Sequence, residues 1–236
     1  MLTVLSAKAS PGVTTTALLL AAALPTPAVL VEADPAGGSL GPRFGLGDEP
    51  GLRTLAVRAR RDLDPAMVAD HTQPVGSVAV VVGPPTADEA DAVLSTAIEP
   101  LVDVLSTMPS VVVDAGRTRP GAPTWSLIRR SACCVVVCRP CLDEFRPAAG
   151  LATELKEAGV DAGFVCRGSA PYAPVEFAAE AGVELLGVLP EDPRGAAALR
   201  GEPCRPRTLE RSSLWLAGRT LVERVRLIDH ESAVAR

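Results

Sequence analysis

The segment that decides the fold lies near the start of the chain, where residues 8–16 read Lys8-Ala9-Ser10-Pro11-Gly12-Val13-Thr14-Thr15-Thr16. The apolar stretch 2–6 precedes this segment, and the apolar run 17–24 follows it. A strand, a tight turn with a glycine and a helix that opens on hydroxyl side chains are typical of a phosphate-binding loop. The same residues also suit a plain strand–helix turn whose glycine and hydroxyls only cap the helix.

Strands and helices are expected to alternate along the whole chain. Apolar, β-rich runs predict strands at 2–6, 28–32, 78–82, 111–114, 132–138, 162–166 and 185–189. Helices are expected at 14–24, 52–61, 65–71, 87–105, 124–130, 147–157, 174–181 and 212–228. Nearly continuous valine and leucine strands are typical of a parallel sheet covered on both faces. The sequence therefore predicts an α/β protein with a doubly wound, mostly parallel sheet, and with sites at the carboxyl ends of its strands.

Composition narrows the functional classes. The chain has 236 residues, of which 47% are hydrophobic and 22% charged, enough to bury one substantial core. A net charge of −5 argues against a surface that coats nucleic acid. No apolar run approaches the roughly 20 residues that span a bilayer, and no secretory leader precedes residues 17–24. We expect a cytoplasmic protein with one domain over residues 1–228 and a short tail at 229–236.

The six cysteines do not predict metal or redox chemistry. Cys133, Cys134 and Cys138 lie in or beside an apolar run and have the character of small buried hydrophobes. Cys138 and Cys141 have thioredoxin-like spacing, but they follow a strand far from the chain start, and no second cysteine pair or nearby histidine completes a zinc site. We therefore interpret them as structural residues.

Residues 8–16 resemble the deviant Walker A motif of the ParA/MinD family, Lys-Gly-Gly-x-Gly-Lys-Thr-Thr. Lys8 matches the family's signature lysine, which reaches the partner's phosphates in a nucleotide-sandwich dimer. Lys8 and Lys156 are the only lysines among 23 basic residues, which makes this match notable. Gly12 is retained, whereas Val13 takes the place of the catalytic lysine. Thr14 falls on the position of the Mg²⁺ ligand.

Two further motifs follow in the family's order. The stretch Glu32-Ala33-Asp34 with Gly38 and Leu40 resembles Asp-x-Asp-x-x-x-Gly-x-Leu, whose first carboxylate positions the attacking water and whose second lies near Mg²⁺. Glu32 keeps that carboxylate on an arm one methylene longer. The run Val111–Asp114 resembles a Walker B motif, in which the aspartate orients metal-bound water. A strand-end turn capped by carboxylates remains the simpler interpretation of Glu32 and Asp34.

The later segments complete the resemblance. Cys166-Arg167 stands where the family has Asn-Arg, with the asparagine reading adenine, and a cysteine offers no equivalent donor–acceptor edge. Leu186–Asp192 resembles Leu-Gly-x-Ile-Pro-x-Asp, and Arg200–Pro203 resembles its Gly-x-Pro continuation. The resemblance implies three carboxylates in catalysis, Glu32, Asp34 and Asp114, and Mg²⁺ on Thr14, Asp34 and Asp114. It implies nucleotide binding by Lys8, Ser10, Pro11, Gly12, Val13, Thr14, Thr15, Cys166, Arg167 and Pro190.

By this resemblance, the protein is a positioning or assembly factor that binds ATP and Mg²⁺ and dimerises with nucleotide, with weak or absent hydrolysis because of Val13. The degenerate Walker A loop of this chain resembles the loops of the TadZ/CpaE branch of the family, whose members mark the assembly site of Tad-type pili. The alternatives are a chromosome-partitioning or septum-site ATPase, and a scaffold with an empty nucleotide pocket. A protein partner at a pole, septum or nucleoid is implied. The apolar stripe of the last helix is expected to pack on the sheet, because the acidic residues after it offer little to lipid.

Overall fold

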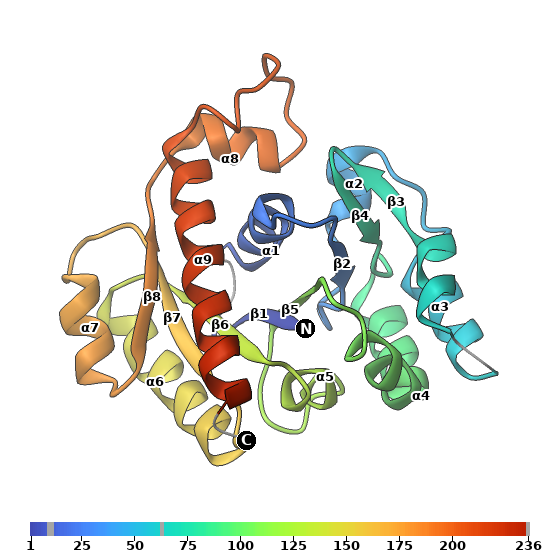
Figure 1. Ribbon diagram of the computed structural model, residues 1–236, viewed down its shortest axis with the longest axis horizontal. Coiled ribbons are helices and arrows are strands. Elements are labelled where there is room, and N and C mark those ends of the chain that lie inside the picture. Colours follow the sequence, from blue (N-terminus) through green and yellow to red (C-terminus); the bar gives the residue numbers. More distant parts are fainter. Residues whose placement is uncertain (9–11, 62–63, 235–236) are drawn as a thin grey trace.

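The computed structural model describes residues 1–8, 12–61 and 64–234, with the side chains of 228–234 excepted. A sheet with the strand order β3-β4-β2-β5-β1-β6-β7-β8 forms the centre of the molecule (Figure 1). Its strands are β1 Leu2–Ser6, β2 Val29–Glu32, β3 Gln73–Val75, β4 Val78–Val81, β5 Val111–Arg117, β6 Cys133–Cys138, β7 Ala162–Arg167 and β8 Glu184–Leu189. All the strand pairs are parallel except β3–β4. The predicted fold class is confirmed.

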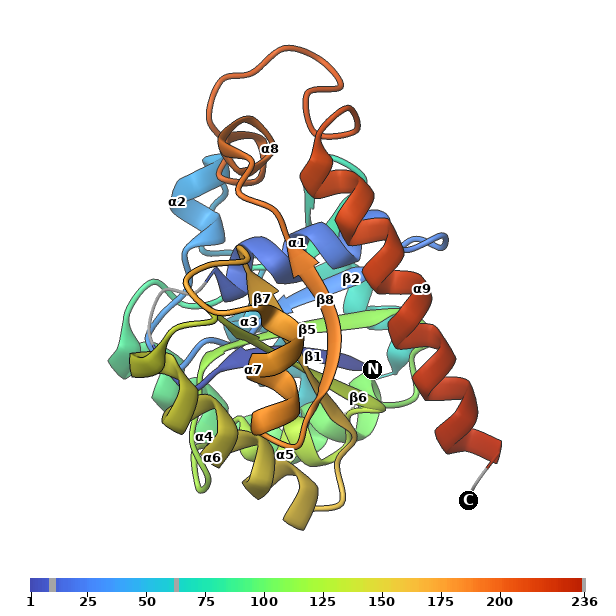
Figure 2. The same ribbon diagram turned by 90° about the vertical axis from the view of Figure 1, so that its left-hand side faces the viewer.

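Helices cover both faces of the sheet, as the turned view in Figure 2 shows. The helices are α1 Val13–Ala23, α2 Leu40–Phe44, α3 Leu52–Ala59, the 3-10 helix η1 Pro65–His71, α4 Ala87–Leu105, α5 Trp125–Arg129, α6 Leu142–Glu157, α7 Pro174–Glu180, α8 Pro193–Leu199 and α9 Ser213–Val234. One apolar cluster joins α1, α2, α8 and α9 to the sheet, and a second joins α3 to α7 to the opposite face. We call the first of these the α1 face.

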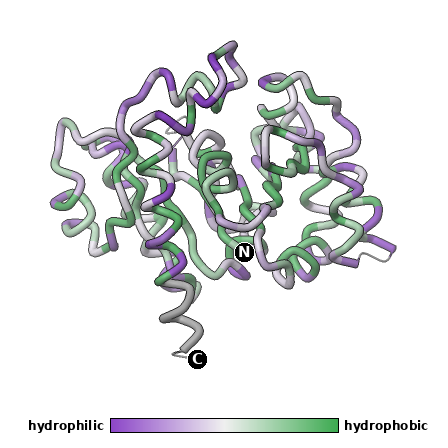
Figure 3. The backbone as a smooth tube through the Cα atoms, turned by 45° about the horizontal axis from the view of Figure 1, so that its top comes forward, coloured by the Kyte–Doolittle hydropathy of each residue, from purple (hydrophilic) through white to green (hydrophobic). Residues whose placement is uncertain are grey.

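Helix α1 is apolar on nearly all sides because it is enclosed by the sheet and α9. Its Leu18, Leu19 and Leu20 are at most 3% exposed, as expected for a helix without a solvent face. Gly218 of α9 permits the close approach, since a Cβ there would lie 2.7 Å from Leu19 Cγ. Figure 3 shows the result: hydrophobic colour follows the central strands and α1, and hydrophilic colour follows the outer loops.

Strand alternation determines which side chains reach the α1 face. Along β2 and β5, Leu30 and Val112 belong to the cluster of the α1 face, while Val31 and Val113 belong to the opposite cluster. Because successive side chains of a strand point to opposite faces, positions two further along return to the α1 face. Glu32 and Asp114 therefore face α1, and they are register partners on neighbouring strands.

Three elements were not predicted from the sequence, and two helices have other bounds. Strand β3 was not expected, because Pro74 disfavours a strand, but β3 is an edge strand that loses no ladder bond to this proline. The short helices α2 and α8 were also missed. Helix α6 begins at Leu142 instead of 147, and α9 runs to Val234 instead of ending at 228. The remaining strands and helices lie where the sequence predicted them, with differences at their ends.

Candidate functional site

The candidate site lies at the carboxyl ends of β1, β2 and β5, where α1 begins. Gly12 caps α1 in the left-handed conformation, with φ of 98°, a conformation that glycine adopts without strain. The amide groups of the first turn of α1 have no partner within the helix, so this end of the helix attracts anions. Residues 9–11 lie outside the described residues, and with them the predicted nucleotide-binding residues Ser10 and Pro11.

A cavity of about 460 Å³ lies on one side of the start of α1. We call it the phosphate-side cavity. It brings together residues from the β1 end, the α1 start, the segment between β2 and α2, and the end of β5: Ser6, Gly12, Val13, Thr14, Thr15, Asp34, Ala36, Gly37, Ser39, Arg43, Gly116 and Arg117. Five of the residues that the sequence predicts for Mg²⁺ or nucleotide line this cavity, and Asp114 is not among its lining residues: the five are Gly12, Val13, Thr14, Thr15 and Asp34.

A second cavity, of about 370 Å³, lies on the other side of the α1 start, and Gly12 and Thr15 line both cavities. Arg167 and Pro190, which the sequence predicts to bind nucleotide, line this second cavity, which we call the base-side cavity. The Arg167 side chain packs against Gly12, because a Cβ built on Gly12 would lie 4.0 Å from Arg167 Nη1. The two cavities therefore adjoin each other at the start of α1.

Cys166 is not brought to either cavity. It is fully buried among the residues of the opposite face, whereas Val165 belongs to the α1 face. The strand alternation that sends Arg167 toward the cavity therefore sends Cys166 away from it. Cys166 is the register partner of Cys138, and the neighbouring Cys166 thiol, together with burial, raises the pKa of Cys138 well above its usual range. These cysteines have the properties of core residues.

Asp114 is fully buried at the floor of the site. Its Oδ1 accepts a hydrogen bond from the Gly116 amide at 3.0 Å, while Oδ2 has no hydrogen-bond partner within the described part of the chain. Burial raises the pKa of Asp114 to about 7, and the charges of Glu32 and Asp34 add to the shift, which the Thr14 hydroxyl and the Gly116 amide oppose. A buried carboxylate oxygen without a donor, next to a hydroxyl, suits a hard divalent cation.

Asp34 is close enough to Asp114 for its charge to raise the pKa of that group, and it depends on Gly116 for its position. Asp34 Oδ1 accepts a hydrogen bond from the Ala36 amide at 2.8 Å, and burial raises the pKa of Asp34. A Cβ on Gly116 would clash with the Asp34 carboxylate, and Gly116 has φ of +55°. Only glycine at position 116 therefore leaves room for this carboxylate at the cavity.

Glu32 does not present a free carboxylate to the cavity. Its Oε1 accepts hydrogen bonds from the amides of Ser39 (2.6 Å) and Leu40 (2.9 Å), and Oε2 from the amide of Gly83 (3.0 Å). Burial raises the pKa of Glu32, and these three amides and Arg43 oppose that shift. The carboxylate predicted to orient water is held by backbone donors, and it ties together the segments that follow β2 and β4.

Neither Val13 nor Lys8 brings a positive charge to the two cavities in the single chain. Val13 is 6% exposed and packs in the core of the α1 face while lining the phosphate-side cavity. Lys8 is partly exposed, with its Nζ 3.6 Å from Asp143 Oδ2 of α6. In the single chain, the predicted signature lysine therefore contacts α6 and is absent from the residues that line the two cavities.

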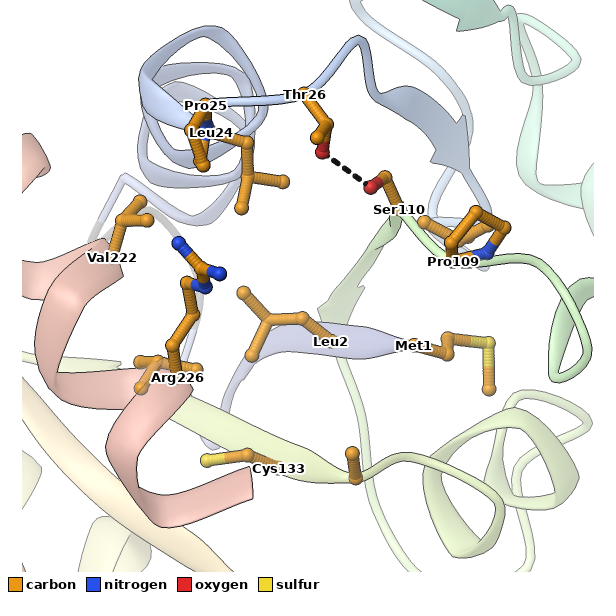
Figure 4. Close-up of a pocket in the computed structure, with 13 residues that line it drawn as sticks. Met1, Leu2, Leu24, Pro25, Thr26, Pro109, Ser110, Cys133, Val222 and Arg226 are labelled. Carbon is orange, nitrogen blue, oxygen red and sulfur yellow. Dashed lines mark hydrogen bonds between the residues drawn. The ribbon is translucent and has the colours of Figure 1, made fainter. Parts of the chain in front are cut away.

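A third cavity, of about 360 Å³, lies at the amino ends of the central strands, between the end of α1 and α9. Figure 4 shows its mostly apolar lining, with Thr26 Oγ1 2.7 Å from Ser110 Oγ at its rim. None of the predicted site residues lines this cavity. In parallel sheets ligands bind at the carboxyl ends of strands. The carboxyl ends of β1, β2 and β5, which carry the predicted motifs, are therefore the better candidate for the functional site.

Mg²⁺ fits the residues present only together with an anionic ligand. No group of three or more histidine, cysteine, aspartate or glutamate side chains suited to a metal occurs among the described residues. Mg²⁺ at nucleotide sites is held by one or two carboxylates or hydroxyls together with substrate phosphates and water. Thr14, Asp34 and the free oxygen of Asp114 match that pattern.

No helix in the described part of the chain has the length and apolarity to cross a membrane.

The chain has the fold of the MinD/ParA P-loop ATPases, an eight-stranded, mostly parallel sheet with flanking helices. The chain is similar to the MinD cell division ATPase of Pyrococcus furiosus, with 21% identity, a TM-score of 0.76 and coverage of 96% of this chain and 98% of that one. It is also similar to a ParA family ATPase of Chlorobium tepidum, with 18% identity, a TM-score of 0.77 and coverage of 94% and 98%. A MinD of Pyrococcus horikoshii complexed with Mg-ADP has 20% identity, a TM-score of 0.75 and coverage of 95% and 94%. No protein-family model and no curated protein matches the sequence.

Proposed function

We propose that this protein is a ParA/MinD-like positioning or assembly factor that binds ATP with Mg²⁺ and hydrolyses it slowly or not at all. The observation that carries the proposal is the pair of cavities at the α1 start: one is lined by Thr14 and Asp34, with the buried Asp114 next to them, and the other is lined by Arg167 and Pro190. Bound Mg²⁺ would supply positive charge against the phosphates. The amides at the α1 start would orient the phosphate groups.

Slow hydrolysis follows from two features of this site. Val13 gives no cation where a P-loop lysine would contact the transferring phosphoryl group, and electrostatic stabilisation is the largest catalytic contribution in such chemistry. Glu32, in the place of the water-positioning aspartate, is occupied by backbone amides. A protein that retains ATP suits a role in which a partner recognises the bound state.

A titration with ATP and Mg²⁺ tests nucleotide binding, and a scaffold with an empty pocket would show none. Light scattering then tests the sandwich dimer: we expect wild type to dimerise with Mg-ATP and Lys8→Ala to stay monomeric. Asp143→Asn frees Lys8 from its contact within the chain and should favour the dimer. Lys156→Ala, at the other lysine, is the control. Equal dimerisation of wild type and Lys8→Ala would remove the sandwich argument.

A tagged copy in cells tests the positioning role. We expect foci at a pole, septum or nucleoid that disperse in Thr14→Ala, while Thr153→Ala, a threonine on the surface of α6, retains them. Diffuse fluorescence together with phosphoryl transfer to a small molecule would favour a metabolic enzyme. Gene neighbours separate the finer options, because pilin-like and secretion-ATPase genes favour a Tad-type system and a centromere-binding partner favours partition.

A further inference from the structure

The phosphate-side cavity contains a cation that the sequence motifs do not assign. Two arginines line this cavity, Arg43 of α2 and Arg117 at the end of β5. Arg117 is exposed, whereas Arg43 is half-buried. The Nη1 atom of Arg43 is buried and has no hydrogen-bond partner among the residues that the structure describes. A buried guanidinium donor without an acceptor is unfavourable, so this atom marks a place where an acceptor is expected.

The backbone on both sides of Arg43 is held in place. The carboxylate of Glu32 binds the amides of Ser39 and Leu40 at the start of α2. Gly201, which follows α8, packs against the Arg43 carbonyl so closely that a Cβ would overlap it. Arg43 is therefore presented to the cavity from a helix with fixed position, which lowers the entropic cost of a contact with a ligand.

The carboxylates around the cavity repel an anionic ligand, and Arg43 offers positive charge that offsets this repulsion. Glu32 is close enough for the positive charge of Arg43 to lower its pKa, but its oxygens already accept backbone hydrogen bonds. Asp34 and Asp114 add negative charge on the same face. A terminal phosphate at this side of α1 would meet these carboxylates, and a guanidinium offers it paired donors in a geometry that matches phosphate oxygens.

We propose that Arg43 contacts the terminal phosphate of the bound nucleotide and supplies, from within the same chain, the positive charge that Val13 does not provide. This inference rests on the proposed function, because it requires the nucleotide to lie with its base toward Arg167 and its phosphates toward Asp34. Through this contact Arg43 strengthens the binding of ATP and leaves the binding of ADP nearly unchanged, so it distinguishes a triphosphate from a diphosphate.

Calorimetric titration of Mg-ATP and Mg-ADP into wild type, Arg43→Ala and Arg43→Lys tests this role. Loss of a charge-assisted contact weakens binding by about ten- to hundred-fold, and we expect Arg43→Ala to show this loss for ATP. For ADP we expect a change of less than about three-fold, which is below 0.7 kcal/mol. Arg43→Lys should recover part of the affinity for ATP. Arg53→Ala, at an exposed arginine paired with Glu49, is the matched control and should bind as wild type does.

Equal weakening for ATP and ADP would overturn the proposal, because it would show that Arg43 only supports the loop. Unchanged binding of ATP to Arg43→Ala would overturn it as well. If Arg43→Ala does not fold, Arg43→Gln keeps the length of the side chain without its charge and is compared in the same way. Failure of wild type to bind either nucleotide would instead refute the proposed function, and that result is distinguishable because it appears in the wild-type titration.

Discussion

Replacing Asp114 by asparagine removes a charge from a fully buried position and should stabilise the protein in the absence of metal and nucleotide. Burial raises the pKa of Asp114 from 3.8 to about 7. The folded protein therefore holds a proton that the unfolded chain releases between about pH 4 and pH 7, and stability falls as pH rises through that window. A shift of about three units corresponds to roughly 4 kcal/mol at pH 8 and to roughly 1.5 kcal/mol at pH 5.

Asparagine suits this test because Oδ1 still accepts the Gly116 amide, while Nδ2 replaces an oxygen that has no hydrogen bond among the described residues. Urea unfolding at pH 5 and pH 8 should show a stabilisation by Asp114→Asn that is about 2.5 kcal/mol larger at pH 8. Asp103→Asn, whose side chain is 74% exposed, should show no such difference. Equal effects of Asp114→Asn at both pH values, or a loss of stability at pH 8, would refute the reasoning.

Two further substitutions probe the geometry of the site. Gly116→Ala should lower the free energy of unfolding, measured in urea, by about 2 kcal/mol or more, because the new Cβ would clash with Asp34 and φ at this position is positive. The control is Gly150→Ala on α6, where a Cβ meets open space, and it should be neutral or stabilising in the same assay. Val13→Lys should raise ATP hydrolysis by about one to two orders of magnitude. Val13→Met, which keeps an apolar side chain at position 13, should leave the rate unchanged in a phosphate-release assay, and a rate in wild type typical of P-loop enzymes would contradict the argument.

The sequence predicted the central strands well because buried parallel strands are continuous apolar runs. It missed β3, a three-residue edge strand with Pro74 at its centre, since such a strand depends on its neighbour and not on its own composition. It also missed α8, although Asp192 caps this helix and Pro193 opens it. Asp192 and Pro193 therefore predict the start of a helix, although Asp192 also belongs to the segment Leu186–Asp192 that resembles a family motif.

Motif order located the site, but it did not determine where each side chain points. Cys166 and Arg167 are adjacent in sequence, yet the alternation of β7 sends them to opposite faces. The hydrogen bonds of Glu32 depend on amides 7, 8 and 51 residues away, which no local pattern reveals. Arg43 follows Pro42 in a short helix that was not predicted, so its place in the cavity emerged only from the tertiary structure.

The contact between Gly201 and Arg43 has a consequence for the kinetics of nucleotide exchange. It joins the segment after α8, beside the base-side cavity, to α2, beside the phosphate-side cavity, so that the two halves of the molecule meet across the start of α1. A nucleotide that extended through both cavities, as proposed above, would lie near both segments that this contact joins. We expect a partner that binds α2 or the segment after α8 to change the rate at which the proposed nucleotide is released.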